Sequence, residues 1–487
     1  MHPPGIETVA AIHASDDSSA APEGSIKRHG VRRPPASRRI VVIGAGAAGL
    51  MAARAGALRT RDNAGPVEVI VLEKNSKTGV KILMSGGTRC NLTHDTDPRS
   101  ICRNFGHAER FLQTAVGRLP PSHIVRRFDE WGVATKVEST GKIFPVSDSA
   151  VDVRDALHRA AVQSGVQIRT RTAVESLRPV ATSGGTPGFE LTLRVGREEQ
   201  SESITADAVI VTTGGRSWPK CGTTGDAYAW LTTLGHSIVP TRPALVPIVG
   251  GRPWMHNLSG VTLPDVIATV HRGEQTGKKH CIASRRASLL WTHFGFSGPA
   301  AMDVSGAVTA MASPADAALR FDLTPDHSPD DWHRRLAGIA RNRIANKVSE
   351  AADRKLPSKL IAALVAESIG HSSVDNEHQQ PSRKTLRLLI ECLKALRVPV
   401  AGTRGFDKAE VTAGGVSLDE VDRRTMRSAR HENLFIAGEV LDVDGPIGGF
   451  NFQAAFATGE SAGIAAASYI ASGSGTNSTN VSIATCR

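Results

Sequence analysis

The feature that most constrains the fold is a glycine-rich turn between an apolar strand and a helical segment. Residues 40–43 form a continuous apolar run, typical of a strand buried on both faces of a parallel sheet. The turn Gly44-Ala45-Gly46-Ala47-Ala48-Gly49 follows, and after an alanine-rich stretch the apolar run 67–72 ends at Glu73. This order predicts a βαβ unit of the kind that binds a dinucleotide.

Each position of the turn has a physical reason. Gly44 permits the tight turn, Gly46 lets the backbone approach a pyrophosphate, and Gly49 lets the helix pack closely on the strand. Ala47 and Ala48 open the helix, where free N–H groups and the positive end of the helix dipole face the phosphates. The acid that closes the second strand is placed to accept hydrogen bonds from the adenosine ribose. The alternative is a glycine-rich turn followed by an ordinary surface glutamate.

A second half of the same arrangement lies near the C-terminus. Residues 433–439 are typical of a buried strand that ends in an acid, and a helix begins about ten residues later. A βαβ unit at one end and a strand with a helix start at the other is the split arrangement of FAD-binding folds. The second helix N-terminus can face the isoalloxazine carbonyl and stabilise negative charge there. The flavin contacts predicted in this segment are Gly438, Glu439, Gly448, Gly449, Phe450 and Asn451.

Between these two ends the sequence pattern changes twice, first to short β-type stretches and then to basic helices. The predicted fold class is therefore α/β, a split Rossmann-like FAD-binding domain with an inserted β-barrel-like domain and a small helical domain. The predicted segments are a disordered leader (1–37), the N-terminal half of the FAD-binding domain (38–219), the β-barrel-like domain (220–324), the helical insert (325–397), the C-terminal half of the FAD-binding domain (398–472) and a flexible tail (473–487).

The charge of the chain bears on its partners. A formal net charge of +11 favours anionic partners, and an ordinary basic surface and a nucleic-acid footprint are both open interpretations. A charge run is usually a solvated helix face, but the density of cations in the helical insert suggests a phosphate-tracking surface with Trp332 as a stacking residue. These cations are Arg334, Arg335, Arg341, Arg343, Lys347, Arg354, Lys355, Lys359, Arg383, Lys384, Arg387, Lys394 and Arg397.

The composition also excludes several classes of protein. No apolar run is long enough to cross a bilayer, and the N-terminus lacks the apolar region of a signal peptide. The six cysteines form no CxxC pair and have no histidine partners at zinc spacing. We therefore expect a cytoplasmic protein that holds no metal ion.

Several blocks of the sequence resemble the YhiN/BaiN-type flavoproteins. The most specific is Lys81-Ile82-Leu83-Met84-Ser85-Gly86-Gly87-Thr88-Arg89-Cys90-Asn91, similar to a lysine-led SGGGRCN-type signature in which Thr88 replaces an expected glycine. The other blocks, in order, are residues 141–147, 213–226, 292–299, 411–417 and 438–451. Together they span nearly the whole chain after its leader.

The resemblance implies a non-covalent FAD that is reduced by NAD(P)H. It also implies reduction of a C=C bond conjugated to a carbonyl, either in a steroid-like enone or in a uridine of ribosomal RNA. Hydride from the flavin N5 adds to the β-carbon, and an acid protonates the α-carbon. Because the chain has one GxGxxG turn, we expect NAD(P)H to visit the flavin face that the substrate also uses. A small enone or amine substrate, or a non-catalytic RNA-binding flavoprotein, are the alternatives.

The identity of the acid is open at this stage. Cys90 is the leading candidate, since a thiol can protonate carbon, although it can equally be a small buried residue. His293 can orient the substrate or simply pack beside aromatic residues. Arg89 can bind the pyrophosphate or pair with an acid. The remaining predicted cofactor contacts are Lys74, Lys81, Gly86, Gly87, Asn91, Gly214 and Gly215, and Cys90 is predicted to contact the cofactor as well.

Overall fold

The computed structural model describes residues 38–63, 67–182, 185–196, 200–273, 278–352, 355–369 and 380–473. The predicted leader, the tail beyond residue 473 and Arg354 lie outside the described residues. The predicted limits of the domains stay a prediction.

The two ends of the chain build one parallel sheet, as the sequence predicts. Its strand order is β20-β10-β1-β2-β6, and all four pairings are parallel. The central strand β1 is fully buried over residues 40–42, because other elements of the same apolar core cover both faces of the sheet. The strands are β1 (Arg38–Ile43), β2 (Val67–Leu72), β6 (Gln167–Arg169), β10 (Ala208–Val211) and β20 (Leu434–Ile436).

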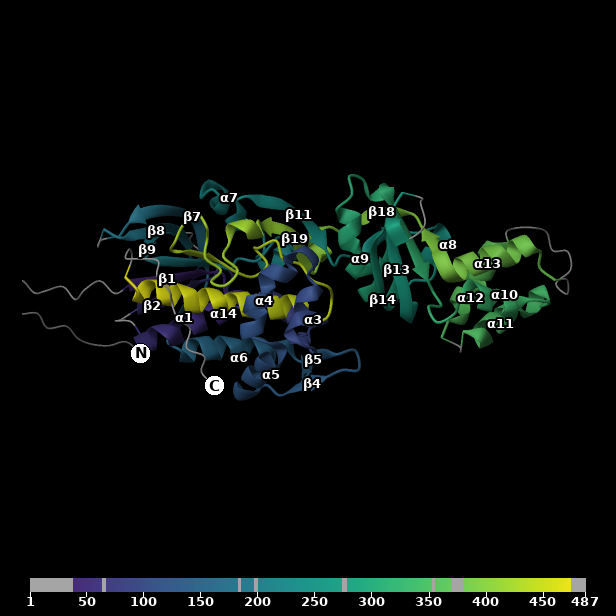
Figure 1. Cartoon of the computed structure of the whole chain (residues 1–487), viewed down its shortest axis with the longest axis horizontal. Helices are drawn as coiled ribbons and strands as arrows, with labels where there is room; N and C mark the ends of the chain where they lie inside the picture. Colours follow the sequence, from purple (N-terminus) through teal and green to yellow (C-terminus); the bar gives the residue numbers. More distant parts are fainter. Residues whose placement is uncertain are drawn as a thin grey trace, which may run out of the picture. The chain divides into compact units, whose positions relative to one another are not determined.

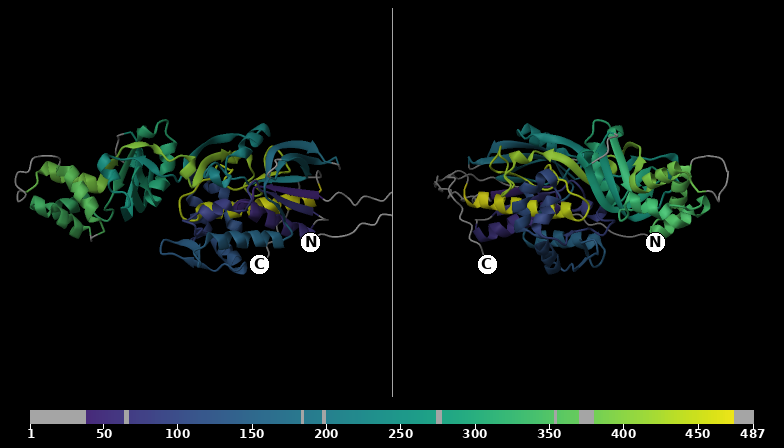
Figure 2. Two further views of the ribbon diagram at one scale, coloured as in Figure 1. Left: turned by 180° about the vertical axis from the view of Figure 1, so that it is seen from behind. Right: turned by 45° about the vertical axis from the view of Figure 1, so that its right-hand side comes forward.

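Helices α1 (Ala47–Asn63) and α14 (Phe450–Ala471) lie side by side against this sheet (Figure 1). Both views of Figure 2 show the yellow C-terminal helix next to the purple N-terminal elements. The small residues of α14 make this approach possible. A Cβ at Gly459 would lie 2.3 Å from the Ala48 carbonyl oxygen, and one at Gly463 would lie 2.0 Å from that of Ala52.

Smaller elements surround the parallel sheet. The predicted hairpin at residues 174–195 is the β7–β8 pair, to which β9 adds a third strand. A second three-stranded sheet has the order β3-β5-β4. The elements are α2 (Val80–Met84), β3 (Thr93–His94), α3 (Pro98–Arg103), α4 (Glu109–Arg118), α5 (Pro121–Glu130), β4 (Thr135–Val137), β5 (Lys142–Pro145), α6 (Ala150–Gln163), β7 (Thr172–Ala181), β8 (Pro187–Val195), β9 (Gln200–Ala206) and α7 (Asp226–Thr233).

The inserted β-type segment forms a seven-stranded sheet with the order β17-β16-β13-β14-β15-β12-β18. Its outermost strands, β17 (Leu396–Val398) and β18 (Val400–Thr403), are separated in the chain by Pro399 alone. The two edges of the sheet must therefore meet, which curls it in the manner of a barrel. Its other elements are β12 (Ile248–Gly250), α8 (Pro253–His256), β13 (Thr262–Arg272), β14 (Cys281–Thr292), β15 (Gly295–Ser297), α9 (Pro299–Thr309) and β16 (Ala317–Asp322). Strands β11 (Ile238–Ala244) and β19 (Val411–Val416) precede and follow this sheet in the chain, and they pair antiparallel with each other.

Four helices form the small helical region: α10 (Pro329–Leu336), α11 (Ile344–Ala351), α12 (Ser358–Ile369) and α13 (Arg383–Ala395). They share one apolar core with the seven-stranded sheet. Trp332 is fully buried in this core, and its indole N–H donates to the Thr324 hydroxyl at 3.0 Å. The prediction that Trp332 stacks on a ligand is therefore wrong, since its ring is enclosed. Among the described residues, no helix is both long and apolar enough for a membrane span.

Candidate functional site

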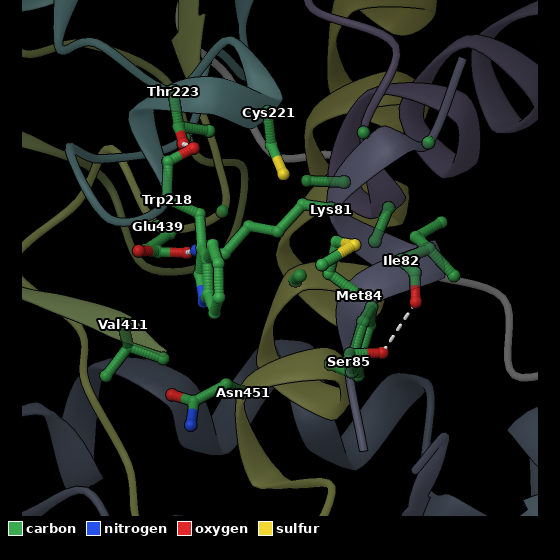
Figure 3. A pocket seen from close by; sticks show the side chains of 18 of the residues that line it. Lys81, Ile82, Met84, Ser85, Trp218, Cys221, Thr223, Val411, Glu439 and Asn451 are labelled. Carbon is green, nitrogen blue, oxygen red and sulfur yellow. Dashed lines mark hydrogen bonds and ion pairs between the residues drawn. The ribbon is translucent and has the colours of Figure 1, made fainter. Parts of the chain in front are cut away.

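A cavity of about 560 Å³ opens at the carboxyl ends of the parallel strands, where ligands bind in open α/β sheets. The last residues of β1 and β2 line its wall, and so do residues that closely follow β10 and β20. Figure 3 shows a portion of this wall, with Cys221 and Thr223 at one end of the view and Val411 and Asn451 at the other. The wall brings together most of the residues predicted from the sequence: Gly44, Gly46, Ala47, Ala48, Glu73, Lys74, Lys81, Gly86, Gly87, Arg89, Asn91, Gly214, Gly438, Glu439, Gly448, Gly449 and Asn451.

The glycine turn fits tightly against its neighbours except at one position. A Cβ at Gly44, whose φ is +101°, would lie 2.7 Å from the Thr212 carbonyl oxygen, and one at Gly49 would lie 1.8 Å from the Gly44 oxygen. A Cβ at Gly46 would meet no protein atom within 4 Å and would project beside the cavity. The missing side chain at Gly46 therefore leaves the room that a pyrophosphate needs to reach the α1 N-terminus.

Glu73 lies in the wall at the end of β2. Its two carboxylate oxygens accept hydrogen bonds from the backbone N–H groups of Ala45 (2.9 Å) and Asn75 (2.8 Å). Burial raises the pKa of this carboxyl, and the two N–H donors oppose the change. Each oxygen keeps a second lone pair, so the group can still accept from the ribose hydroxyls of FAD.

One ion pair and several hydrogen bonds form a network across the middle of the wall. The Lys81 ammonium lies 2.6 Å from Glu439 and donates to the Ser217 hydroxyl at 2.6 Å. Ser217 donates to Glu439 at 2.8 Å, and the Thr412 backbone N–H donates to the same carboxylate at 2.9 Å. The network joins α2, the loop after β10, β19 and the end of β20. Ser217 and Thr412 are members that the sequence analysis missed, because only the fold brings these segments together.

The start of α14 forms another section of the wall. Gly449 has φ +87°, and a Cβ there would lie 2.5 Å from the Thr93 carbonyl group. With its amide oriented to satisfy its neighbours, Asn91 accepts from the Gly449 N–H at 3.0 Å. Asn451 exchanges two hydrogen bonds of 2.8 Å with the backbone of Gly445. These contacts hold the helix N-terminus in place beside the cavity.

Four predicted cofactor contacts do not line the cavity, namely Gly49, Cys90, Gly215 and Phe450, and the last two pack behind its wall. Phe450 is buried and stacks on His94, with the ring centroids 4.9 Å apart. A Cβ at Gly215 would lie 2.4 Å from the Thr412 hydroxyl, so this glycine allows two segments to approach closely. Neither residue lines the cavity.

Arg89 lines the cavity but is engaged by acids. Its guanidinium lies 2.8 Å from Glu138 and 3.3 Å from Asp148, and it covers the ring of Phe144 at 4.0 Å. The sequence left open whether Arg89 binds the pyrophosphate or pairs with an acid, and the structure shows it paired with acids. Thr88 adopts φ +68° at the position where a glycine is expected, a conformation that a residue with a Cβ adopts with strain.

The two predicted catalytic residues are absent from the cavity lining. Cys90 is fully buried in the core of the parallel-sheet region, and burial raises the pKa of its thiol to about 12. His293 is exposed and packs edge-on against Phe294 at 5.0 Å. Neither residue lines the cavity, so neither side chain as placed can donate a proton to a molecule bound there. The sequence predicted their loops but not the direction of their side chains.

The end of the cavity next to the barrel-like sheet is apolar. Leu245, Met302, Val411 and Ile447 pack together there and line the wall. Asp303, which follows Met302 on α9, accepts from the Ile447 backbone N–H at 2.8 Å and pairs with a guanidinium of the seven-stranded sheet. Burial raises the pKa of Asp303 to about 6. The apolar end is therefore held by contacts with both α9 and the loop before α14.

Comparison with known proteins gives consistent matches over most of the chain. A family model described as HI0933-like protein Rossmann domain matches residues 38–465. The ribosomal RNA dihydrouridine synthase of Escherichia coli K12 is 31% identical over 423 residues, 86% of this chain and 95% of that protein. The 3-dehydro-bile acid delta(4,6)-reductase of Clostridium scindens is 30% identical over 435 residues, 88% of this chain and 99% of that protein. The ribosomal RNA dihydrouridine synthase of Haemophilus influenzae is 28% identical over 421 residues, 86% of this chain and 96% of that protein.

Proposed function

This chain belongs to the HI0933-like family of Rossmann-domain proteins, and from that premise we propose that it reduces a C=C bond conjugated to a carbonyl, with NAD(P)H as the electron source. It is an FAD-dependent oxidoreductase by its family and its relatives. The observation that supports the proposal is that one relative is named for making dihydrouridine in ribosomal RNA and another for a delta(4,6) reduction of a bile acid, and both names denote reduction of a C=C bond. In uridine and in a 3-keto-4,6-diene alike, the double bond that is reduced is conjugated to a carbonyl.

The residues of the wall fit FAD. Gly46 and the α1 N-terminus would hold the pyrophosphate, Glu73 the ribose, and the Lys81–Glu439 pair the ribityl hydroxyls. The chemistry that FAD supplies when bound is hydride transfer. The N-terminus of α14 directs its positive dipole end into the cavity and would stabilise negative charge on the ring. The apolar cluster around Leu245 would exclude water from the face that the substrate approaches.

Uridine in ribosomal RNA is the substrate class that we favour, and with it we propose a cytoplasmic location. Two relatives are named for that reaction. The first turns of α13 support the same view, since Arg383, Lys384 and Arg387 are exposed and form no ion pair with any described residue. These unneutralised cations can contact phosphates, as the helical insert is predicted to do. Reduction of a small apolar enone is the second candidate, favoured by the apolar end of the cavity.

The proposal is tested by following the flavin of the purified protein under anaerobic conditions. NAD(P)H should bleach the flavin, and ribosomal RNA that lacks the modification should restore the oxidised spectrum and gain a dihydrouridine. Recovery with a 3-keto-4,6-diene bile acid but not with RNA would select the enone reductase. Failure of NAD(P)H to bleach the flavin would contradict the proposal and favour a flavoprotein that binds RNA without turnover.

Neutralising the α13 cations should separate the two substrates. We expect the triple variant R383Q/K384Q/R387Q to lower kcat/KM for RNA about 10- to 100-fold at low salt, and to flatten its salt dependence by about one unit of log–log slope per lost phosphate contact. Reduction of a small enone should be unchanged. The control R178Q removes an exposed arginine of β7, far along the chain from the insert, and should leave both activities intact. Equal losses with RNA and enone in the triple variant would contradict a role in RNA binding.

A further inference from the structure

Glu410 is a carboxylate in the cavity wall that the roles assigned above leave unused. It directly precedes β19, and its backbone N–H donates to the Leu245 carbonyl at 3.0 Å. Its own carbonyl accepts from the Ser217 hydroxyl at 3.4 Å. The neighbours on either side thus belong to the apolar cluster and to the charged network. Glu410 lies where the charged middle of the cavity meets its apolar end.

Glu410 differs from the other three carboxylates of the wall in its partners. Glu73 accepts from two backbone N–H groups, and Asp226 is paired with a lysine. Glu439 is paired with a lysine and accepts from a serine hydroxyl and a backbone N–H. The Glu410 carboxylate forms no ion pair with any described residue. Of the four, it is the group whose charge the protein neutralises least.

The surroundings of Glu410 favour its neutral form. Burial is the largest effect and raises the pKa of this carboxyl. The Lys81 ammonium lowers the pKa, the Glu439 carboxylate raises it again, and the Trp218 indole has a smaller lowering effect. A raised pKa leaves more of the carboxyl protonated at a given pH, which favours its use as a general acid.

Cys221 supplies a thiol to the wall, and its position is less suitable for donating a proton to the substrate. Its carbonyl accepts from the Asn75 side chain at 3.0 Å, which places it beside Glu73 at the ribose end. Figure 3 shows Cys221 at the end of the cavity away from Val411 and Asn451. Burial also raises the pKa of its thiol. Glu410, next to Val411, is the acid on the side of the α14 N-terminus.

We propose that Glu410 is the general acid of the reduction and donates its carboxyl proton to the α-carbon of the conjugated double bond. This assignment rests on the proposed function. Hydride supplied by the reduced cofactor forms the new C–H bond at the β-carbon, and the electron pair of the C=C bond takes the proton from Glu410 at the α-carbon. The carboxyl is left as a carboxylate, which regains a proton from solvent. NAD(P)H is the reductant consumed.

The test separates reduction of the flavin from its reoxidation. In E410Q, FAD content and the rate of anaerobic bleaching by NAD(P)H should stay within about twofold of wild type. Reoxidation by RNA or by a 3-keto-4,6-diene should be about 10²- to 10⁴-fold slower, the usual contribution of a general acid. E410D retains an acid and should recover some of the rate. The matched control is E130Q, which changes an exposed carboxylate on α5 and should behave as wild type.

A spectroscopic measurement checks the proton itself without turnover. In an infrared titration from neutral to acid pH, the C=O stretching band of one carboxylic acid should appear at a higher pH than for an exposed glutamate, in wild type and in E130Q but not in E410Q. An unchanged band in E410Q, or reoxidation of E410Q at the wild-type rate, overturns the assignment of Glu410 alone. If wild type itself is not reoxidised by any conjugated substrate, the proposed function has failed, and the assignment of Glu410 as its acid falls with it.

Discussion

Gly46→Ala is expected to weaken FAD binding about 10- to 100-fold, equal to about 1.4–2.8 kcal/mol, while the apoprotein stays folded. The reason is the empty space at this position. A Cβ at Gly46 meets no protein atom within 4 Å, so the folded chain can accommodate it, but it projects where the pyrophosphate would approach the backbone. Fluorescence titration of the apoprotein with FAD measures the affinity, and urea unfolding measures the stability.

Two other glycine substitutions serve as controls for this prediction. Gly49→Ala places its Cβ 1.8 Å from the Gly44 oxygen, so helix and strand must separate, and the free energy of unfolding should fall by about 3 kcal/mol or more. Gly117→Ala lies on the exposed side of α4 with no atom within 4 Å, and should stabilise the protein by about 0.5–1 kcal/mol without effect on FAD. Wild-type affinity in G46A would contradict the pyrophosphate cradle.

The parallel sheet could be predicted because its signals are local in the sequence. The apolar run at residues 40–43, the glycine turn and the acid at residue 73 are each encoded within a few neighbouring residues. A strand buried on both faces must be apolar throughout, and a tight turn needs glycine, so these patterns hold wherever the rest of the chain lies. The strand and helix start near the C-terminus predicted that both ends of the chain belong to one FAD-binding fold, and the sheet confirms that they meet.

The reactive region of the site could not be predicted in the same way. Lys81 meets Ser217 and Glu439 across 136 and 358 residues of chain, and nothing local to any of them reveals the others. The prediction that Cys90 is the proton donor fails for a different reason. Its loop was predicted to lie at the cavity, but its own φ of +59° accompanies a side chain that is fully buried in the core. Glu410 gave no signal beyond its position before a buried strand, and only the three-dimensional wall shows that its carboxylate lacks an ion pair with the described residues.

Removing Lys81 or Glu439 should move the pH dependence of flavin reoxidation in opposite directions. The Lys81 ammonium lowers the pKa of Glu410 and the Glu439 carboxylate raises it. The acid must be protonated to donate, so the rate falls as pH rises through this pKa. In K81M the pKa of Glu410 rises, and the fall in the reoxidation rate should move to higher pH. In E439Q the pKa of Glu410 is lowered, and the fall in the reoxidation rate should move to lower pH.

Both variants should also bind FAD more weakly, because each leaves one partner of a partly buried pair without its counter-charge. The Lys81 and Glu439 side chains are 25% and 20% exposed. The loss of free energy from breaking their pair should therefore stay below the roughly 3–5 kcal/mol seen for a fully buried pair. Stopped-flow reoxidation of the FAD-loaded fraction across pH measures the shifts, with K77M, an exposed lysine near the same segment, as the control. When E410Q is added to either variant, the shift should vanish, since the titrating group is gone. Shifts of the same sign in K81M and E439Q, or shifts that persist with E410Q, would mean that another group controls the proton.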